Sequence, residues 1–227
     1  IAGTGSTISF GLQTTAGTYT VVATNTSTGC SAPMSGSATV TVNSLPTAFT
    51  VTGGGSYCTG GAGVAIGLSS STSGVNYQLY RGATTVGSPV AGTGSATSFG
   101  NQTTAGTYTV VATNATSGCT NSMSGSVTVT VNSLPFVFTV GGGGTYCAGG
   151  STGPAITLSG STGLTTYQLY RGSTPVGIPV SGTGGGLNFG TFTSVGTYSV
   201  SATSTATGCT NAMSATATVS TISLPIA

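Results

Sequence analysis

The sequence has almost no charged residues. Its 227 residues include no Asp, Glu or His, and its two charged side chains are Arg81 and Arg171. General acid–base catalysis needs a group that exchanges a proton near neutral pH, and an activated Ser or Cys nucleophile needs a neighbouring base. Zinc and calcium sites need clusters of Cys, His or carboxylate ligands. The composition therefore argues against an enzyme, a metal site and a bound cofactor.

Basic patches and long apolar runs are also absent. A net charge of +2 on two isolated arginines cannot form the basic stripe that neutralises phosphates, so we expect no nucleic-acid partner. No apolar run approaches the roughly 18 residues of a membrane span, so we expect no membrane insertion. The opening IAGTGSTISFG lacks the basic and apolar regions of a signal peptide, as expected of a processed chain or an internal fragment.

What the sequence does contain is an internal repeat. GTGSTISFGLQTTAGTYTVVATNTSTGC, which ends at Cys30, recurs almost unchanged up to Cys119 and more loosely up to Cys209. The spacings between these cysteines are 89 and 90 residues. Such a period is typical of an array of similar domains.

Leu-Pro pairs close each copy and suggest the boundaries. They lie at Pro46, Pro135 and Pro225, and a proline stops a strand because it has no N–H to donate. We therefore predict a half-repeat at 1–46 and complete repeats at 47–135 and 136–227. Because 1–46 matches only the second half of a repeat, either the chain is a window cut from a longer array or another chain supplies the missing strands.

Apolar residues alternate with small or polar ones, which is the period of a β-strand. Four such runs stand out in the middle repeat: Val64 to Leu68, Val75 to Leu79, Tyr108 to Ala112 and Val127 to Val131. Turn-forming residues separate the runs, so we predict an all-β fold of tandem antiparallel β-sandwiches with about seven short strands per repeat.

These residues resemble an immunoglobulin-like domain, and more specifically the tandem Ig-like repeats of giant secreted surface proteins of Bacteroidota. VNYQLYRG at 75–82 resembles strand C of that fold, and AGTYTVVATN at 105–114 resembles strand F. The resemblance implies that Tyr108, like Tyr19 and Tyr198, forms a tyrosine corner. Val110 stands where antibody domains carry their second core cysteine, so the usual disulfide between the two sheets is absent.

Five cysteines without metal-binding partners suggest disulfides formed in an oxidising compartment. They are Cys30, Cys58, Cys119, Cys147 and Cys209. We first expect pairing within each repeat, Cys58 with Cys119 and Cys147 with Cys209, which leaves Cys30 with a partner outside the chain. In Ig topology, however, the two cysteines of one repeat would lie at opposite ends of the sandwich. Either the first strand folds back at Gly53 to Gly55, or the bond joins neighbouring domains through Cys58 and Cys209.

Two further pairs, Tyr80 with Arg81 and Tyr170 with Arg171, are candidates for a surface contact. They occupy equivalent positions after the strand-C motif and could stack on a ring or bind a carboxylate, although a solvated strand end is the simpler interpretation.

Uncharged strand edges favour association, because exposed edges normally carry charges that block pairing with another chain. The resemblance implies an extracellular, cell-surface location. We therefore expect a structural repeat protein of a fibre, filament or stalk that self-associates with identical chains. An adhesin module that binds carbohydrate or another surface is the alternative.

Overall fold

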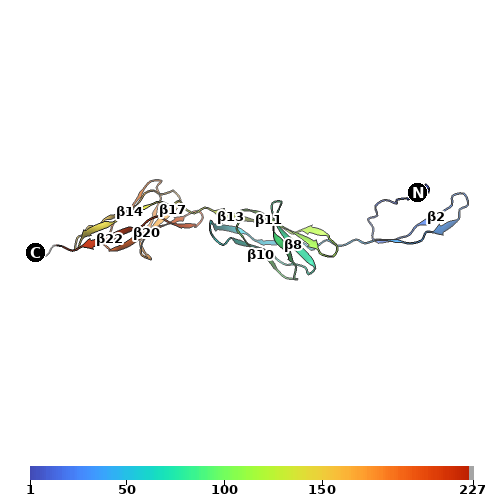
Figure 1. Ribbon diagram of the computed structural model, residues 1–227, viewed down its shortest axis with the longest axis horizontal. Coiled ribbons are helices and arrows are strands. Elements are labelled where there is room, and N and C mark those ends of the chain that lie inside the picture. The colour runs from blue at the N-terminus through green and yellow to red at the C-terminus, as the bar shows by residue number, and fades with distance from the viewer. Residues whose placement is uncertain (225–227) are drawn as a thin grey trace.

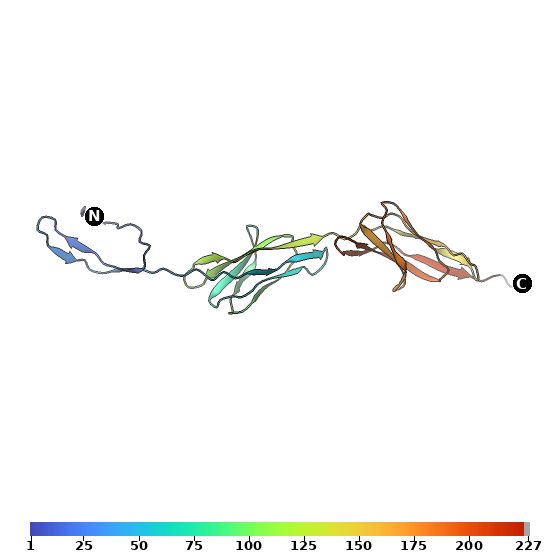
Figure 2. The ribbon, with the colours of Figure 1, turned by 180° about the vertical axis from the view of Figure 1, so that it is seen from behind.

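The computed structural model describes residues 1–224 and shows three units in a row, with the N-terminus in the unit at one end and the last complete repeat at the other (Figures 1 and 2). No helix occurs among these residues.

The first unit holds β1 (Gly17–Tyr19), β2 (Val22–Thr24), β3 (Ser31–Pro33) and β4 (Ala38–Val40). The middle repeat holds β5 (Val51–Gly53), β6 (Gly55–Cys58), β7 (Val64–Leu68), β8 (Val75–Arg81), β9 (Thr84–Ala91), β10 (Thr97–Gln102), β11 (Gly106–Asn114), β12 (Thr120–Ser122) and β13 (Val127–Asn132). The last repeat holds β14 (Val140–Gly142), β15 (Gly144–Cys147), β16 (Ala155–Leu158), β17 (Thr165–Arg171), β18 (Thr174–Ser181), β19 (Leu187–Thr191), β20 (Gly196–Ser204), β21 (Thr210–Ala212) and β22 (Ala217–Ile222).

Each complete repeat is a sandwich of two sheets. In the middle repeat one sheet has the order β10-β7-β5, and the other has the order β6-β13-β11-β8-β9 with β12 paired to β11. The last repeat repeats this arrangement strand for strand. The predicted all-β, Ig-like fold is therefore confirmed, and each of the four alternating runs forms a strand. Residues 225–227, with the third Leu-Pro proline, lie outside the described residues.

The repeats have more strands than the predicted seven because the first strand is split in two and a short strand, β12 or β21, is added beside β11 or β20. β5 pairs antiparallel with β7, and β6 then crosses to the other sheet and pairs parallel with β13. Gly53 and Gly54 make the crossing with φ of 90° and 75°, a conformation that favours glycine. A Cβ at Gly54 would lie 2.9 Å from the Thr128 carbonyl oxygen. The glycine run thus moves the strand from one sheet to the other and does not fold it back.

The cores consist of the inward residues of these strands. In the middle repeat Tyr77, Leu79 and Val110 are almost completely buried, and their counterparts form the core of the last repeat. Tyr77 is also satisfied, because its hydroxyl accepts a hydrogen bond from the Thr72 amide at 2.9 Å. Each core therefore buries a large ring without leaving its polar atom unpaired.

The predicted tyrosine corners are confirmed in all three units. Tyr108 donates its hydroxyl hydrogen to the Thr104 carbonyl at 2.7 Å, and Tyr198 does the same to Ser194 at 2.7 Å. Tyr19 makes the equivalent bond to Thr15 at 2.9 Å. This bond fixes the turn that enters the longest strand of each complete repeat.

The first unit contains only two small pairs of strands. β1 pairs with β4, and β2 pairs with β3. Residues that correspond to buried positions of the complete repeats are exposed there, among them Val21 and Met34.

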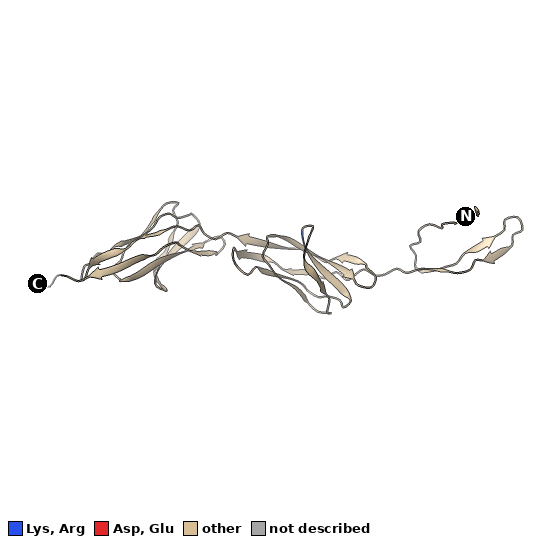
Figure 3. Ribbon diagram, in the orientation of Figure 1, with Lys and Arg blue, Asp and Glu red and all other residues tan. Residues whose placement is uncertain are grey.

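The surface carries almost no charge, and the ribbon coloured by charge is nearly uniform (Figure 3). Among the described residues, no helix is long and apolar enough to span a membrane.

Candidate functional site

The candidate site is the joint between the middle and last repeats, where a disulfide links Cys58 to Cys209. The two Cα atoms are 5.6 Å apart, although 151 residues separate the cysteines in the sequence. Cys58 ends β6 of the middle repeat, and Cys209 directly precedes β21 of the last repeat. The bond therefore crosses from one sandwich to the next.

Hydrogen bonds place both cysteines beside the connecting segment. Cys58 is the register partner of Asn132 at the end of β13, and the next amide, of Thr59, donates to the Asn132 carbonyl at 2.8 Å. On the other side of the joint, Asn211 Nδ2 donates to the carbonyl of buried Pro135 at 2.9 Å. The linker and the disulfide thus run side by side, and the two sandwiches are attached at two points.

The expected pairing within each repeat is wrong for these cysteines. Cys58 lies at the end of its repeat that faces Pro135, whereas Cys119 follows β11 and precedes β12 at the end that faces Pro46. The two cysteines of one repeat therefore lie at opposite ends of the sandwich, farther apart than a disulfide reaches. The structure adopts the alternative in which the bond joins neighbouring domains.

The other three cysteines are unpaired in the described chain. Cys30 and Cys147 are exposed, and Cys119 is partly buried. Cys30 and Cys119 occupy the repeat position of Cys209, and Cys147 occupies that of Cys58. Each unpaired cysteine is therefore the equivalent of a residue that forms the inter-repeat bond elsewhere in the chain.

The two tyrosine–arginine pairs do not form a common surface. Arg81 follows buried Leu79 by two residues and so lies on the core side of β8, whereas Tyr80 lies on the outer side. The stem of Arg81 lies over Gly106, where a Cβ would be 2.9 Å from Arg81 Cγ. The same alternation puts Tyr170 and Arg171 on opposite faces of β17.

Sequence reasoning missed the asparagines of the joint. Asn121 repeats the contact of Asn211, because its Nδ2 donates to the Pro46 carbonyl at 2.7 Å. The signal was present as the motif Gly-Cys-Thr-Asn, which occurs at 118–121 and again at 208–211. The first unit has Ala32 at this position and cannot make the bond.

Sequence reasoning also missed the role of Gln78. Its Nε2 donates to the carbonyls of Leu79 at 2.8 Å and Val86 at 3.1 Å, where the register between β8 and β9 shifts. Gln168 makes the same bonds in the last repeat. These side chains bind carbonyl groups of both strands beside the bulge.

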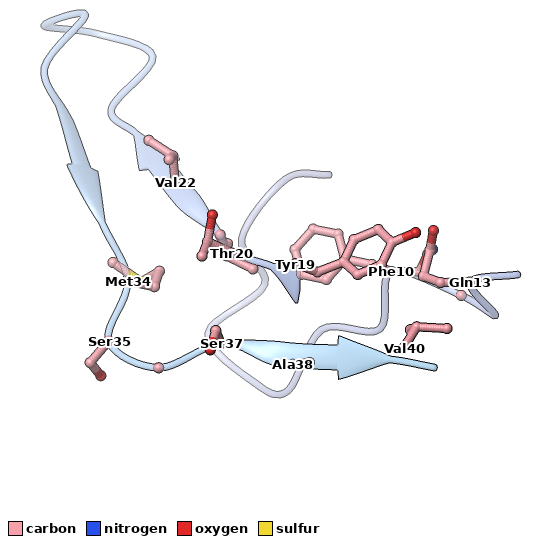
Figure 4. A pocket seen from close by; sticks show the side chains of 13 residues that line it. Phe10, Gln13, Tyr19, Thr20, Val22, Met34, Ser35, Ser37, Ala38 and Val40 are labelled. Atoms are coloured by element: carbon pink, nitrogen blue, oxygen red, sulfur yellow. The ribbon is translucent and has the colours of Figure 1, made fainter. Parts of the chain in front are cut away.

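The described residues hold no cluster of metal ligands. They contain no group of three or more Cys, His, Asp or Glu side chains that could hold a metal ion. The first unit has a groove of about 830 Å³, lined by residues such as Phe10, Tyr19 and Val40 (Figure 4). The lining of this groove is mainly apolar.

Comparison with known proteins gives a likeness of fold alone. The chain matches no protein family, and no curated protein resembles it. Among solved structures, the human OSCAR ligand-binding domain is 12% identical with a TM-score of 0.33, over 78% of this chain and 100% of that one. The fibronectin(III)-like modules of Clostridium thermocellum CbhA are 16% identical with a TM-score of 0.39, over 76% of this chain and 95% of that one. Sidekick-1 immunoglobulin domains 1–5 are 16% identical with a TM-score of 0.38, over 91% of this chain and 46% of that one.

Proposed function

We propose that this chain is a non-enzymatic structural element of an extracellular fibre, filament or stalk, and that its task is to carry tension between its ends. The observation that supports this most directly is the disulfide across the joint. Disulfides persist in oxidising compartments, which fits a location outside the cell, at its surface. A bond placed between domains holds an array together and adds nothing to a ligand site.

The strand order of each repeat suits a load along the array. β6, near the start of the repeat, and β13, at its end, are parallel neighbours. When the joint disulfide is reduced, tension applied to the two ends of the repeat pulls these strands in opposite directions along their length. The hydrogen bonds between them must then break together and not one after another, which raises the force that the repeat withstands.

The length of the repeat also suits this task. The nine residues of β11 span about 30 Å at roughly 3.3 Å per residue. Because the units lie end to end (Figure 1), each further repeat adds its full length to the reach of the array.

Self-association with identical chains belongs to this proposal, and the edges favour contacts end to end over contacts side to side. The edge strand β9 carries Pro89 and a bulge against β8, and β18 carries Pro179 in the same place. Proline and bulges block pairing with another strand, and they do so here without charge.

The alternative is an adhesin module that binds carbohydrate or another surface. Tyr80 and Tyr170, on the outer faces of their sheets, are the residues that favour it, because aromatic rings stack on sugar rings. A glycan-array measurement with Tyr80→Ala tests it, with Thr128→Ala, an exposed threonine of the same sheet, as the matched control. Binding that the tyrosine variant loses and the control retains would support adhesion.

Electron microscopy of the native, unconcentrated material tests the structural proposal. We expect continuous filaments or strings of evenly spaced beads about 30 Å or more long. Separate compact particles that stay monomeric at high concentration would contradict it.

A further inference from the structure

The two halves of the joint disulfide are not equally accessible. Cys209, in the turn between β20 and β21, is 0% exposed. Cys58, at the end of β6, is only partly buried. A thiolate breaks a disulfide by attacking one of its two sulfur atoms, and the attack requires access to that atom. Because Cys209 is closed to solvent, Cys58 is the half of the bond that an external thiol reaches.

Attack at Cys58 sends the bonding electron pair to Cys209. The bond between the two Sγ atoms breaks, a mixed disulfide forms between Cys58 and the external thiol, and Cys209 leaves as a thiolate. One disulfide has then replaced another, so the step needs no oxidant. Complete reduction needs a second external thiol, which attacks the mixed disulfide and removes the first thiol as a small-molecule disulfide.

Hydrogen bonds hold Cys58 against the connecting segment without help from the disulfide. Cys58 is the register partner of Asn132 at the end of β13. The amide and the hydroxyl of the next residue, Thr59, both donate to the Asn132 carbonyl, at 2.8 and 3.0 Å. Asn132 precedes Pro135 by three residues, so Cys58 stays close to the linker when the bond between the sulfur atoms is broken.

Cys209 is held against the same segment from the other side. The Ser204 amide donates to the Cys209 carbonyl at 2.9 Å, and the Gly208 amide donates to the Ser204 carbonyl at 2.9 Å, which fixes the turn. Two residues after Cys209, Asn211 Nδ2 donates to the Pro135 carbonyl at 2.9 Å. The two cysteines are therefore connected by a short path of backbone and hydrogen bonds that does not pass through their sulfur atoms.

We propose that Cys58 is the site at which small-molecule thiols modify the joint, and that Cys209 is the resolving thiol that removes them. The tethered Cys209 thiolate attacks Cys58 Sγ, the original bond reforms, and the small molecule leaves as a thiolate. A group tethered in this way acts at an effective concentration of about 1 mM or more, so it competes with a second external thiol. The inference rests on the proposed function, since it describes how the joint of a load-bearing array stays closed.

Mass spectrometry of the full chain tests where the thiol attacks. The unpaired cysteines are first blocked with a maleimide, and the chain is then incubated with reduced glutathione and quenched with acid at intervals. Newly released thiols are alkylated, and trypsin cuts after Arg81 and Arg171, which puts Cys58 and Cys209 on different fragments. We expect glutathione on Cys58, with at least about tenfold less on Cys209.

The dependence of the reduction rate on glutathione tests the resolving role of Cys209. If Cys209 expels the first glutathione before a second one attacks, two glutathione molecules must act in succession. Doubling the glutathione concentration should then raise the rate of reduction about fourfold, whereas a chain without reclosure would show a rise of about twofold. The rate is followed at about 1 mM glutathione, where reclosure and the second attack compete.

Two asparagines provide a matched pair of variants. Asn211→Ala frees Cys209 from the linker, so the rise on doubling glutathione should fall toward about twofold and the mixed disulfide at Cys58 should accumulate. Asn121→Ala removes the same kind of bond, to the Pro46 carbonyl at 2.7 Å, at the joint that this disulfide does not cross, and should keep the fourfold rise. An asparagine that only stabilised the fold would change the rate of reduction without changing its dependence on glutathione.

Glutathione found on Cys209 as often as on Cys58, or a twofold rise in the unaltered chain, would overturn the inference. The proposed function would survive that result if electron microscopy still shows end-to-end arrays. Compact, separate particles whose disulfide nevertheless recloses through Cys209 would overturn the function and leave the resolving role standing.

Discussion

The disulfide across the joint should shield most of the chain from mechanical force. Tension that enters before Cys58 passes through the disulfide to Cys209 and leaves toward the C-terminus. The 151-residue separation between these cysteines is then spanned by one covalent bond. At about 3.3–3.6 Å per extended residue, the bond holds back about 500 Å of chain. Only the short segments outside the two cysteines can lengthen while the bond is intact.

Single-molecule force spectroscopy on the full chain, held at its two ends, measures this directly. Under oxidising conditions we expect no extension event that releases the complete repeats. After reduction, or in the variant Cys209→Ser, two further events should appear, one for each sandwich, with about 500 Å of added contour length in total. A matched variant is Cys147→Ser, which removes an unpaired thiol and should behave like the unaltered chain. Equal extension before and after reduction would refute the assignment of the bond.

Four further outcomes follow from the structure. The three unpaired cysteines should react with a maleimide in the folded chain, and the two bonded ones only after reduction, as counted by intact mass. Tyr108→Phe removes the bond to the Thr104 carbonyl and should lower the free energy of unfolding by about 1–2 kcal/mol in urea titrations, whereas Tyr80→Phe on the outer face should change it little. Asn211→Ala leaves the buried Pro135 carbonyl without its donor and should speed reduction of the joint disulfide by glutathione several-fold over a Thr218→Ala control. The urea midpoint should stay almost constant between about pH 4 and 7 because no Asp, Glu or His is present to bind protons differently in the folded and unfolded states, and a marked slope would contradict this.

The strands and the corners could be predicted because their signals are local. Tyr77 and Leu79 alternate with polar residues, and that period alone identifies a half-buried strand. The bond of Tyr108 reaches only four residues back, so a short motif is enough to specify it. Such features do not depend on how distant parts of the chain meet.

The disulfide partner could not be fixed in the same way. Connectivity depends on which end of the sandwich each cysteine reaches, and that depends on the crossing at Gly53 and Gly54, which the glycine run allowed but did not specify. Once β6 pairs parallel with β13, Cys58 must lie at the end of its repeat that faces the next one. The repeat spacing then leaves Cys209 as the cysteine within reach. The alternation of apolar and polar residues along a strand does not show which end of the sandwich a cysteine reaches.

The position of the disulfide follows from what each part of the array lacks. Inside the sandwiches Val110 and Val200 take the place of a core cysteine, and both are buried against large apolar neighbours, so the core holds together by packing. Neither core cluster of the described residues extends across the joint. The bond from Asn211 to the Pro135 carbonyl crosses it beside the linker, and a single hydrogen bond contributes about 1 kcal/mol. In a row of domains under tension the weakest connection sets the strength of the whole, so a covalent bond has its largest effect at the joint.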